Sequence, residues 1–261
     1  MSNGSNYALA RICAGAAYAR GATGSGIDVA VIDTGIALYN SGNNYHLDFG
    51  ANNQALPSSK IVTPTGSDYV NSDNIPNDDE GHGTHVAGII GANKNDSGMH
   101  GVAYNAKIKP ITIFNSSGVS DTTTSQLVNA INAGAGSSYA AMNNSWGVSS
   151  VSQINFGGAI GTKWARIPST NSIASSVQTA FDDAASDTAI VFSNGNEGWN
   201  SSTGRVYYYN SSSDASNMTN SQGYSSVTVN TASTYGSLPQ TKTSLNGKWL
   251  TVVALDSSNN I

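Results

Sequence analysis

Short apolar runs and longer amphipathic segments alternate along most of the chain. A short apolar run between Gly or polar turn residues is typical of a buried strand, whereas a longer segment with helical spacing of its apolar residues is typical of a helix. In chain order the pattern predicts a helix at 7–19, a strand at 27–32, a helix that begins at His82, a strand at 107–114, a helix at 122–135, a strand at 138–145, a helix at 173–186 and strands at 188–194 and 248–256. This alternation predicts an α/β fold with a mostly parallel sheet and helices on both faces.

Two polar regions, 39–80 and 198–247, show little periodicity and are expected to be long surface segments. No internal repeat is present, and no linker divides the chain. The 261 residues are enough to enclose one large hydrophobic core. We therefore expect residues 1–261 to form a single domain.

Composition narrows the classes of partner. Charged residues make up 10% of the chain, the net charge is -5, and no cluster of Lys and Arg is present to neutralise phosphates, so we expect no nucleic-acid partner. No segment approaches the length of a membrane-spanning helix. The single cysteine, Cys13, is expected to be a small buried side chain of the first helix. The surface must come mainly from Ser, Asn, Thr and Gly, which favours an exported protein.

Polar residues follow three of the predicted strands. Asp33 follows the strand at 27–32, while Ser145 and Asn196 follow later strands. In open α/β sheets ligands bind beyond the carboxyl ends of the strands, and the helix at His82 opens at the same edge if its connection is a right-handed crossover. Each residue taken alone is more typical of a turn. Their combination is the informative observation.

Four motifs occur in a fixed order: "VAVIDTGI", "GHGTHVAG", "NNSWG" and "SNGNEG". In this order they resemble the subtilisin-like serine peptidases, the subtilase family, and the resemblance runs from about residue 10 to 261. It implies the three-layer subtilisin-like fold. Within the family, "AAYARGATGSGIDVAVIDTGI" and "GMHGVAYNA" look most like the bacterial autotransporter-type branch. That branch implies a secreted or cell-surface location.

The resemblance implies a role for three side chains. His82 matches the general base that takes the proton of the serine nucleophile, and a neutral imidazole suits that task near pH 7. Asp33 would accept the other ring N–H of this histidine and hold the productive tautomer. Asn196 matches the side-chain amide that binds the developing oxyanion.

The family resemblance also implies a groove in which an extended polypeptide substrate pairs with exposed backbone. The matching positions are Gly118 on one side and Ser145, Trp146 and Gly147 on the other. Trp146 stands where the family usually has an aliphatic residue, so the shape of the specificity pocket departs from the usual one. A propeptide of the protein itself is a further implied partner.

No cofactor is expected for catalysis, but the family resemblance implies a structural calcium. The segments "HLDF" and "NKNDSGM" resemble places where many subtilases hold that ion, with Asp48 and Asn95 as oxygen ligands. A metal-dependent hydrolase built on Asp33, His82 and His85 is a rival interpretation. Its spacing disagrees with the His-Glu-x-x-His pattern of zinc peptidases, and we expect His85 to be a packed or hydrogen-bonded residue of the helix's first turn.

The serine nucleophile of the family lies in a Gly-Thr-Ser motif, which does not occur in this sequence, and neither does the Gly-x-Ser-x-Gly motif of the α/β-hydrolases. We therefore expect the chain to be a C-terminally incomplete peptidase domain that is inactive alone. The alternative is a pseudoenzyme that binds extended peptides without cleaving them.

Overall fold

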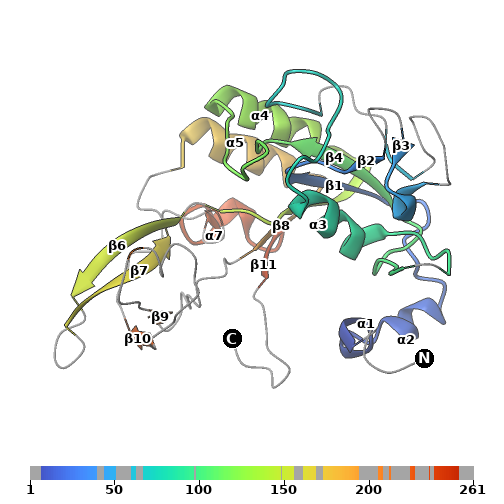
Figure 1. Cartoon of the computed structure of the whole chain (residues 1–261), viewed down its shortest axis with the longest axis horizontal. Helices are drawn as coiled ribbons and strands as arrows, with labels where there is room; N and C mark the ends of the chain where they lie inside the picture. Colours follow the sequence, from blue (N-terminus) through green and yellow to red (C-terminus); the bar gives the residue numbers. More distant parts are fainter. Residues whose placement is uncertain are drawn as a thin grey trace. The chain divides into compact units, whose positions relative to one another are not determined.

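The computed structural model describes residues 7–39, 44–50, 60–62, 67–96, 98–147, 149–155, 161–168, 173–193, 205–207, 212, 224–226, 235 and 238–252 (Figure 1). The chain divides into two compact units. The first contains residues 1–144 and 183–190, and the second contains residues 145–182 and 191–261. That residues 1–261 form a single domain stays a prediction.

The elements follow one another in the predicted order, and they confirm the α/β class. The helices are α1 (Tyr7–Arg11), α2 (Ala14–Tyr18), α3 (His82–Gly91), α4 (Thr124–Ala133), α5 (Ser175–Ala184) and α7 (Leu238–Thr241), with short 3-10 helices η1 (Leu47–Phe49) and η3 (Thr243–Leu245). Strands β1 (Asp28–Asp33), β4 (Lys107–Thr112), β5 (Tyr139–Asn144), β8 (Ala189–Ser193) and β11 (Trp249–Val252) form a sheet in the order β11-β8-β5-β1-β4. Strand β1 pairs in parallel with both β4 and β5.

Three pairs of shorter strands lie outside this sheet. They are β2 (Leu38–Tyr39) with β3 (Asn44–Tyr45), β6 (Ser149–Asn155) with β7 (Thr162–Pro168), and β9 (Arg205–Tyr207) with β10 (Tyr224–Ser226), all antiparallel. The β6–β7 ribbon was not predicted from the sequence. Its strands carry polar residues on both sides, so the period-two alternation that indicates a half-buried strand is weak.

The first predicted helix is broken in two. Between α1 and α2, Cys13 adopts a left-handed backbone conformation with φ of 56°, which ends one helix and starts the next. Its side chain is exposed rather than buried. The prediction of a buried cysteine was wrong because it assumed a continuous helix with one face against the core.

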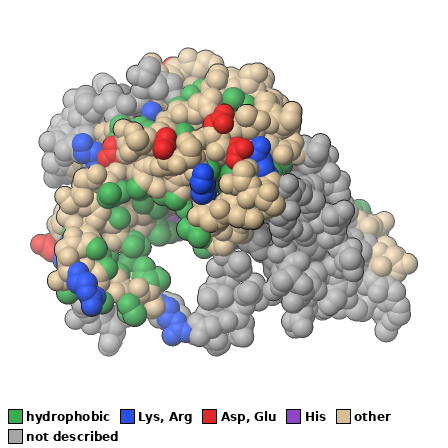
Figure 2. All heavy atoms as spheres, turned by 180° about the vertical axis from the view of Figure 1, so that it is seen from behind, with side chains coloured by type: hydrophobic (Ala, Val, Ile, Leu, Met, Phe, Trp, Pro, Cys, Tyr) green, Lys and Arg blue, Asp and Glu red, His purple; other side chains and the backbone are tan. Residues whose placement is uncertain are grey.

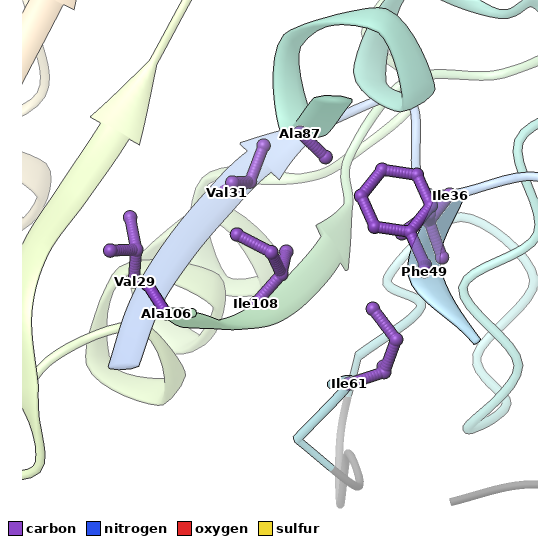
Figure 3. Close-up of a cluster of buried hydrophobic side chains, with 8 residues drawn as sticks. All are labelled: Val29, Val31, Ile36, Phe49, Ile61, Ala87, Ala106 and Ile108. Atoms are coloured by element: carbon purple, nitrogen blue, oxygen red, sulfur yellow. The ribbon is translucent and has the colours of Figure 1, made fainter. Parts of the chain in front are cut away.

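Strand β1 is buried on both faces, and its alternating side chains separate into two packing layers. Val29 and Val31 belong to a cluster on the α3 face of the sheet, which Figure 3 shows. On the opposite face, the Cα of Gly134 at the end of α4 lies so close to Ala30 that an added Cβ would come within 3.2 Å of its side chain. Because successive side chains of a strand point to opposite faces, this alternation places Asp33, like Val31, on the α3 face.

The α3 layer is built from small helical residues against aliphatic strand residues. Ala87 of α3 lies in the same buried cluster as Val31, Ile108 and Phe49 (Figure 3). The helix is not buried on all sides, as its apolar composition had indicated, since Ile89 is 47% exposed. The fully buried residues of the helix are Gly83, Ala87, Gly88 and Gly91, and the partly buried Val86 and Ile90 pack against the same cluster.

The second unit contains a cluster of aromatic side chains. Phe192 stacks on Trp249 with ring centroids 5.0 Å apart and on Tyr235 with centroids 5.5 Å apart, while Phe181 meets these rings edge to face. Such pairs stabilise by about 0.5–1.5 kcal/mol each beyond the area they bury. The cluster is the principal apolar packing of this unit that the described residues show.

The described surface carries few charges. In Figure 2 the acidic and basic side chains are scattered among polar residues and form no extended patch of one sign on the face shown. This agrees with a chain in which charged residues make up 10%.

Close approach of α3 to the end of β1 requires a glycine at position 83. A Cβ on Gly83 would lie 2.4 Å from the carbonyl oxygen of Gly35, which cannot move independently of the backbone. We expect Gly83→Ala to lower the free energy of unfolding by about 2 kcal/mol or more. Gly15→Ala is the matched control, because this helical glycine has open space around it and alanine favours helix. Thermal denaturation of both variants tests this, and an unchanged midpoint for Gly83→Ala would contradict it.

Candidate active site

Asp33 ends β1 with its carboxylate buried on the α3 face of the sheet. The residue is 1% exposed, and its Oδ1 accepts a hydrogen bond from the backbone N–H of Thr34 at 2.8 Å. A buried carboxylate needs polar partners because water no longer solvates it. The partner beyond this local N–H comes from the first residue of α3.

His82 opens α3, and the first N–H groups of this helix are all satisfied. The backbone N–H groups of residues 82, 83 and 84 donate to Glu80 Oε2, Thr34 Oγ1 and Asp78 Oδ2 respectively, each at 2.8 Å. The next N–H, of residue 85, donates to the carbonyl oxygen of Gly81 at 3.1 Å. The residue before the helix is a glycine with φ of 109° and no side chain, so distant side chains replace the usual cap.

These capping contacts fix the helix start relative to the strand end. Thr34 follows Asp33 directly and accepts the N–H of the residue after His82, while Thr84 Oγ1 accepts the N–H of Ala37 at 2.7 Å. The carboxylate of Asp78 accepts from the N–H of Gly81 and from both the N–H and the hydroxyl of Thr84. His82 therefore has little freedom to move away from the carboxyl end of β1.

The imidazole of His82 and the carboxylate of Asp33 form a direct hydrogen bond. Nδ1 of His82 lies 2.7 Å from Oδ1 of Asp33. Since a carboxylate only accepts, the neutral ring carries its proton on Nδ1 and leaves Nε2 free to accept a proton. The histidine side chain is 48% exposed and the aspartate side chain 1% exposed. This arrangement is a buried anion that orients a solvent-accessible base.

Surrounding carboxylates favour the protonated form of this histidine. The hydrogen bond to Asp33 raises the pKa of His82 above its ordinary value of 6.5, partial burial opposes the rise, and the negative charges of Asp33, Glu80 and Asp78 add to it. The capping hydrogen bonds act in the opposite sense on Asp78, whose pKa they hold below its ordinary value despite its burial. The segment before α3 thus supplies structural carboxylates, and the first residue of the helix is a base of raised pKa.

Gly118 lies close to the same helix start. It has φ of 68° in a tight turn, where its N–H donates to the carbonyl oxygen of Asn115 at 2.9 Å. A Cβ at this position would lie 3.8 Å from Oε1 of Glu80, the residue whose carboxylate binds the N–H of His82. Glu80 therefore lies between Gly118, one of the expected substrate-binding positions, and His82 of the Asp33–His82 pair.

The other expected substrate-binding residues belong to the second unit. Ser145 and Gly147 follow β5, and Gly147 has open space around its Cα. The ring of Trp146 lies 5.0 Å from that of Phe192 and 4.9 Å from that of Tyr235, edge to face with both. The tryptophan is therefore part of the aromatic cluster. Asn196, the expected oxyanion donor, lies outside the described residues.

The rival metal interpretation gains no geometric support. His85 was expected to be packed or hydrogen-bonded; it is exposed, its backbone N–H donates to the carbonyl oxygen of Gly81, and its side chain does not join the Asp33–His82 pair. Across the ranges that the structure describes, no group of three or more His, Cys, Asp or Glu residues is arranged to hold a metal ion. Of the residues expected to bind calcium, Asp48 faces the loop of Asn95: its backbone oxygen accepts the N–H of Asn93 at 2.7 Å.

Four residues that organise the site were not singled out from the sequence: Thr34, Asp78, Glu80 and Thr84. A signal for two of them was available, because acidic residues immediately before a helix complement the partial positive charge of its N-terminus. For Thr34 and Thr84 no local pattern indicates the contact, since it joins two segments that are distant along the chain.

Comparisons with known proteins agree with this geometry. The model of the family described as "Subtilase family" matches residues 24–261. Subtilisin E of Bacillus subtilis (strain 168) is 30% identical over 207 residues, which are 77% of this chain and 42% of that protein. An alkaline protease of Alkalihalobacillus alcalophilus is 36% identical over 118 residues, 45% of this chain and 26% of that protein. An extracellular serine protease of Serratia marcescens is 41% identical over 104 residues, 39% of this chain and 8% of that protein.

The chain thus spans less than half of the length of these relatives. The segment that matches the family model contains all four sequence motifs, and it includes both Asp33 and His82.

The titration of His82 tests the electrostatics of the site without any substrate. We expect Asp33→Asn to bring its pKa down toward or below 6.5, and Glu80→Gln to lower it by a smaller amount. Asp187→Asn, which removes an exposed charge at the amino end of β8, is the control and should leave it unchanged. NMR titration of the imidazole signals measures all three.

The same shift predicts how stability depends on pH. Because the pKa of His82 is raised in the folded chain, its stabilising contribution is fully present below about pH 6.5 and is lost as the pH rises through the folded pKa. In Asp33→Asn this component of the pH dependence should disappear. An unaltered titration of His82 in that variant would refute the assignment of the hydrogen bond as the main cause.

Proposed function

Because this chain belongs to the subtilase family, we propose that it provides the aspartate and histidine of a serine endopeptidase centre that acts on polypeptides. The observation that carries the proposal is the 2.7 Å hydrogen bond between Nδ1 of His82 and Oδ1 of Asp33. This bond selects the tautomer in which Nε2 accepts a proton.

The proposed reaction is acyl transfer through a serine. Nε2 of His82 takes the hydroxyl proton as the serine oxygen attacks the substrate carbonyl, and Asp33 stabilises the imidazolium that forms. The imidazolium then protonates the leaving amine as the peptide bond breaks, and a water molecule repeats the sequence to release the acyl group. Asn196 would bind the oxyanion through its side-chain N–H, a role that rests on the family resemblance. No serine of the chain is assigned as the nucleophile.

The substrate would bind as an extended strand along exposed backbone. Gly118, with its contact to Glu80, supports this on the side of the Asp33–His82 pair. Ser145, Trp146 and Gly147 are proposed as further substrate-binding residues by resemblance. The aromatic neighbours of Trp146 would hold its indole as a rigid wall for substrate side chains.

We also propose that the protein acts outside the cytoplasm, at the cell surface or in the medium, in the manner of the autotransporter-type branch. The relative from Serratia marcescens is described as extracellular. Within the part of the chain that the structure covers, no helix combines the length and the hydropathy needed to cross a membrane. The acting protein would also meet its own propeptide as a folding partner.

A structural calcium remains part of the proposal. Asp48 would supply its carboxylate and Asn95 its side-chain oxygen, and the hydrogen bond between the backbone of Asp48 and Asn93 keeps the two segments together. Backbone carbonyl oxygens of the same loop would complete the coordination, because these two side chains alone are too few for calcium.

A catalytically inactive pseudoenzyme that binds peptides is the alternative function. Under this alternative, the chain binds extended peptides in the same groove without cleaving them, and the Asp33–His82 pair has a positioning role only. The two functions differ in whether a covalent acyl intermediate forms.

Peptidase activity of the full product of the gene tests the first function. We expect His82→Ala to lower kcat/KM by about 10⁶-fold and Asp33→Asn by about 10⁴-fold, the sizes known for the subtilisin triad and related ones. Asp187→Asn, which leaves the site untouched, is the control and should retain full activity. Equal activity of the His82 variant and the parent protein would end the proposal.

Labelling with a fluorophosphonate tests whether a serine of this chain acts as a nucleophile. We expect the isolated 261-residue chain to remain unlabelled, since the hydroxyl of an ordinary serine is too weak a nucleophile without the triad setting. Subtilisin E treated in parallel verifies the reagent. Stoichiometric labelling that His82→Ala abolishes would show instead that a serine among these residues serves as the nucleophile.

A further inference from the structure

A cavity of about 210 Å³ opens in the first unit beside the Asp33–His82 pair. Thr34, which follows Asp33 at the end of β1, forms part of its wall, and so does Thr112 at the end of β4. Since Thr34 also accepts the N–H of Gly83, the cavity adjoins the first turn of α3. It lies at the carboxyl edge of the sheet, where α/β proteins bind ligands.

Two carboxylates from distant parts of the chain line this cavity. Asp79 comes from the segment before α3, and Asp121 comes from the segment before α4. Asp79 accepts a hydrogen bond from the side chain of Asn77, which also lines the cavity. Among the described residues neither carboxylate forms an ion pair with a Lys or Arg. The cavity therefore carries negative charge that no basic side chain of the described structure neutralises.

A buried hydroxyl in the same wall also lacks a partner. Thr112 is 2% exposed, and within the described part of the chain its Oγ1 makes no hydrogen bond. A buried polar group without a partner costs about 1–3 kcal/mol, so such groups are rare unless a ligand or water completes them. The wall of the cavity therefore contains a polar side chain whose hydrogen bonding is incomplete among the described residues.

The remaining lining suits a long side chain with a charged end. Val70 and Phe114 are the apolar residues of the lining, whereas Asn71 and Asn115 add polar side chains to the two carboxylates. The methylene stem of an Arg or Lys packs on apolar surface while its charged group donates several hydrogen bonds. Together these features describe a receptor for an organic cation that is attached to a flexible stem.

We propose that this cavity binds the guanidinium or ammonium group of an Arg or Lys side chain in the bound polypeptide, close to the bond that faces His82. Asp79 and Asp121 are the residues that determine this preference. The inference rests on the proposed function in that the ligand is a peptide, but it holds equally for cleavage and for binding without cleavage. It names a substrate class, basic polypeptides, for a groove whose selectivity is otherwise undefined.

Peptide binding to the 261-residue chain tests this directly. The probes are short blocked alanine peptides in which one position at a time carries either Arg or its neutral isostere citrulline. We expect Arg at one or two positions to lower Kd by about fivefold relative to citrulline, as for a partly exposed ion pair. The double variant Asp79→Asn, Asp121→Asn should reduce this ratio to about one without weakening the citrulline peptides.

Asp187→Asn is the matched control, because it removes one negative charge at the amino edge of the sheet, and the ratio should survive in it. Equal Kd values for Arg and citrulline at every position, or a ratio that persists in the double variant, overturn the inference while leaving the proposed function intact.

If no peptide binds, that result counts against the proposed groove, and the cavity is then tested with small compounds. Acetyl-arginine methylamide and acetyl-citrulline methylamide are then compared by NMR on the methyl signals of Thr34 and Thr112. Shifts with the arginine compound alone, lost in the double variant, support the cavity as a cation site by itself. Absence of such shifts overturns it.

Discussion

The close approach of the first turn of α3 to the end of β1 determines the geometry of everything around it. No side chain separates the two elements at their contact, because Gly83 lies directly against Gly35. The contact brings the imidazole of His82 within hydrogen-bonding distance of the buried carboxylate of Asp33. The capping residues of α3 then hold this arrangement, since three of the first four N–H groups of the helix donate to side chains rather than to its own turn.

The acidic residues before α3 perform several tasks at once. Asp78 is used structurally, because its carboxylate caps the helix and binds Thr84. Glu80 caps the N–H of His82 and also adds negative charge that favours the imidazolium. Asp79 alone of the three turns toward the cavity. One short acidic segment therefore contributes to helix formation, to the basicity of the histidine and to the charge of the adjoining space.

Much of the fold could be predicted from the sequence because its signals are local. Short apolar runs predicted β1 and β4, and the glycine-rich start at His82 predicted α3 at its observed first residue. The pairing of Asp33 with His82 was predicted through the motifs that surround them. Two features depend on segments that are distant along the chain: Asp79 and Asp121 line one cavity, and the Oγ1 of Thr112 has no hydrogen-bond partner among the described residues. The break at Cys13, which exposes a side chain expected to be buried, is a local change of backbone conformation that the spacing of apolar residues does not indicate.

The alternation of side chains along β1 has a consequence for the kinds of sequence change that this family of chains can tolerate. Val31 and Asp33 share the α3 face because exactly one residue, Ile32, lies between them. Deleting or inserting a single residue within the strand would rotate the carboxylate into the aliphatic layer beneath α4, and no compensating change at His82 could recover it. Length variation should therefore accumulate in the polar region between residues 39 and 80, while the short stretch from Asp28 to Gly35 keeps its residue count through any divergence that preserves the histidine's partner.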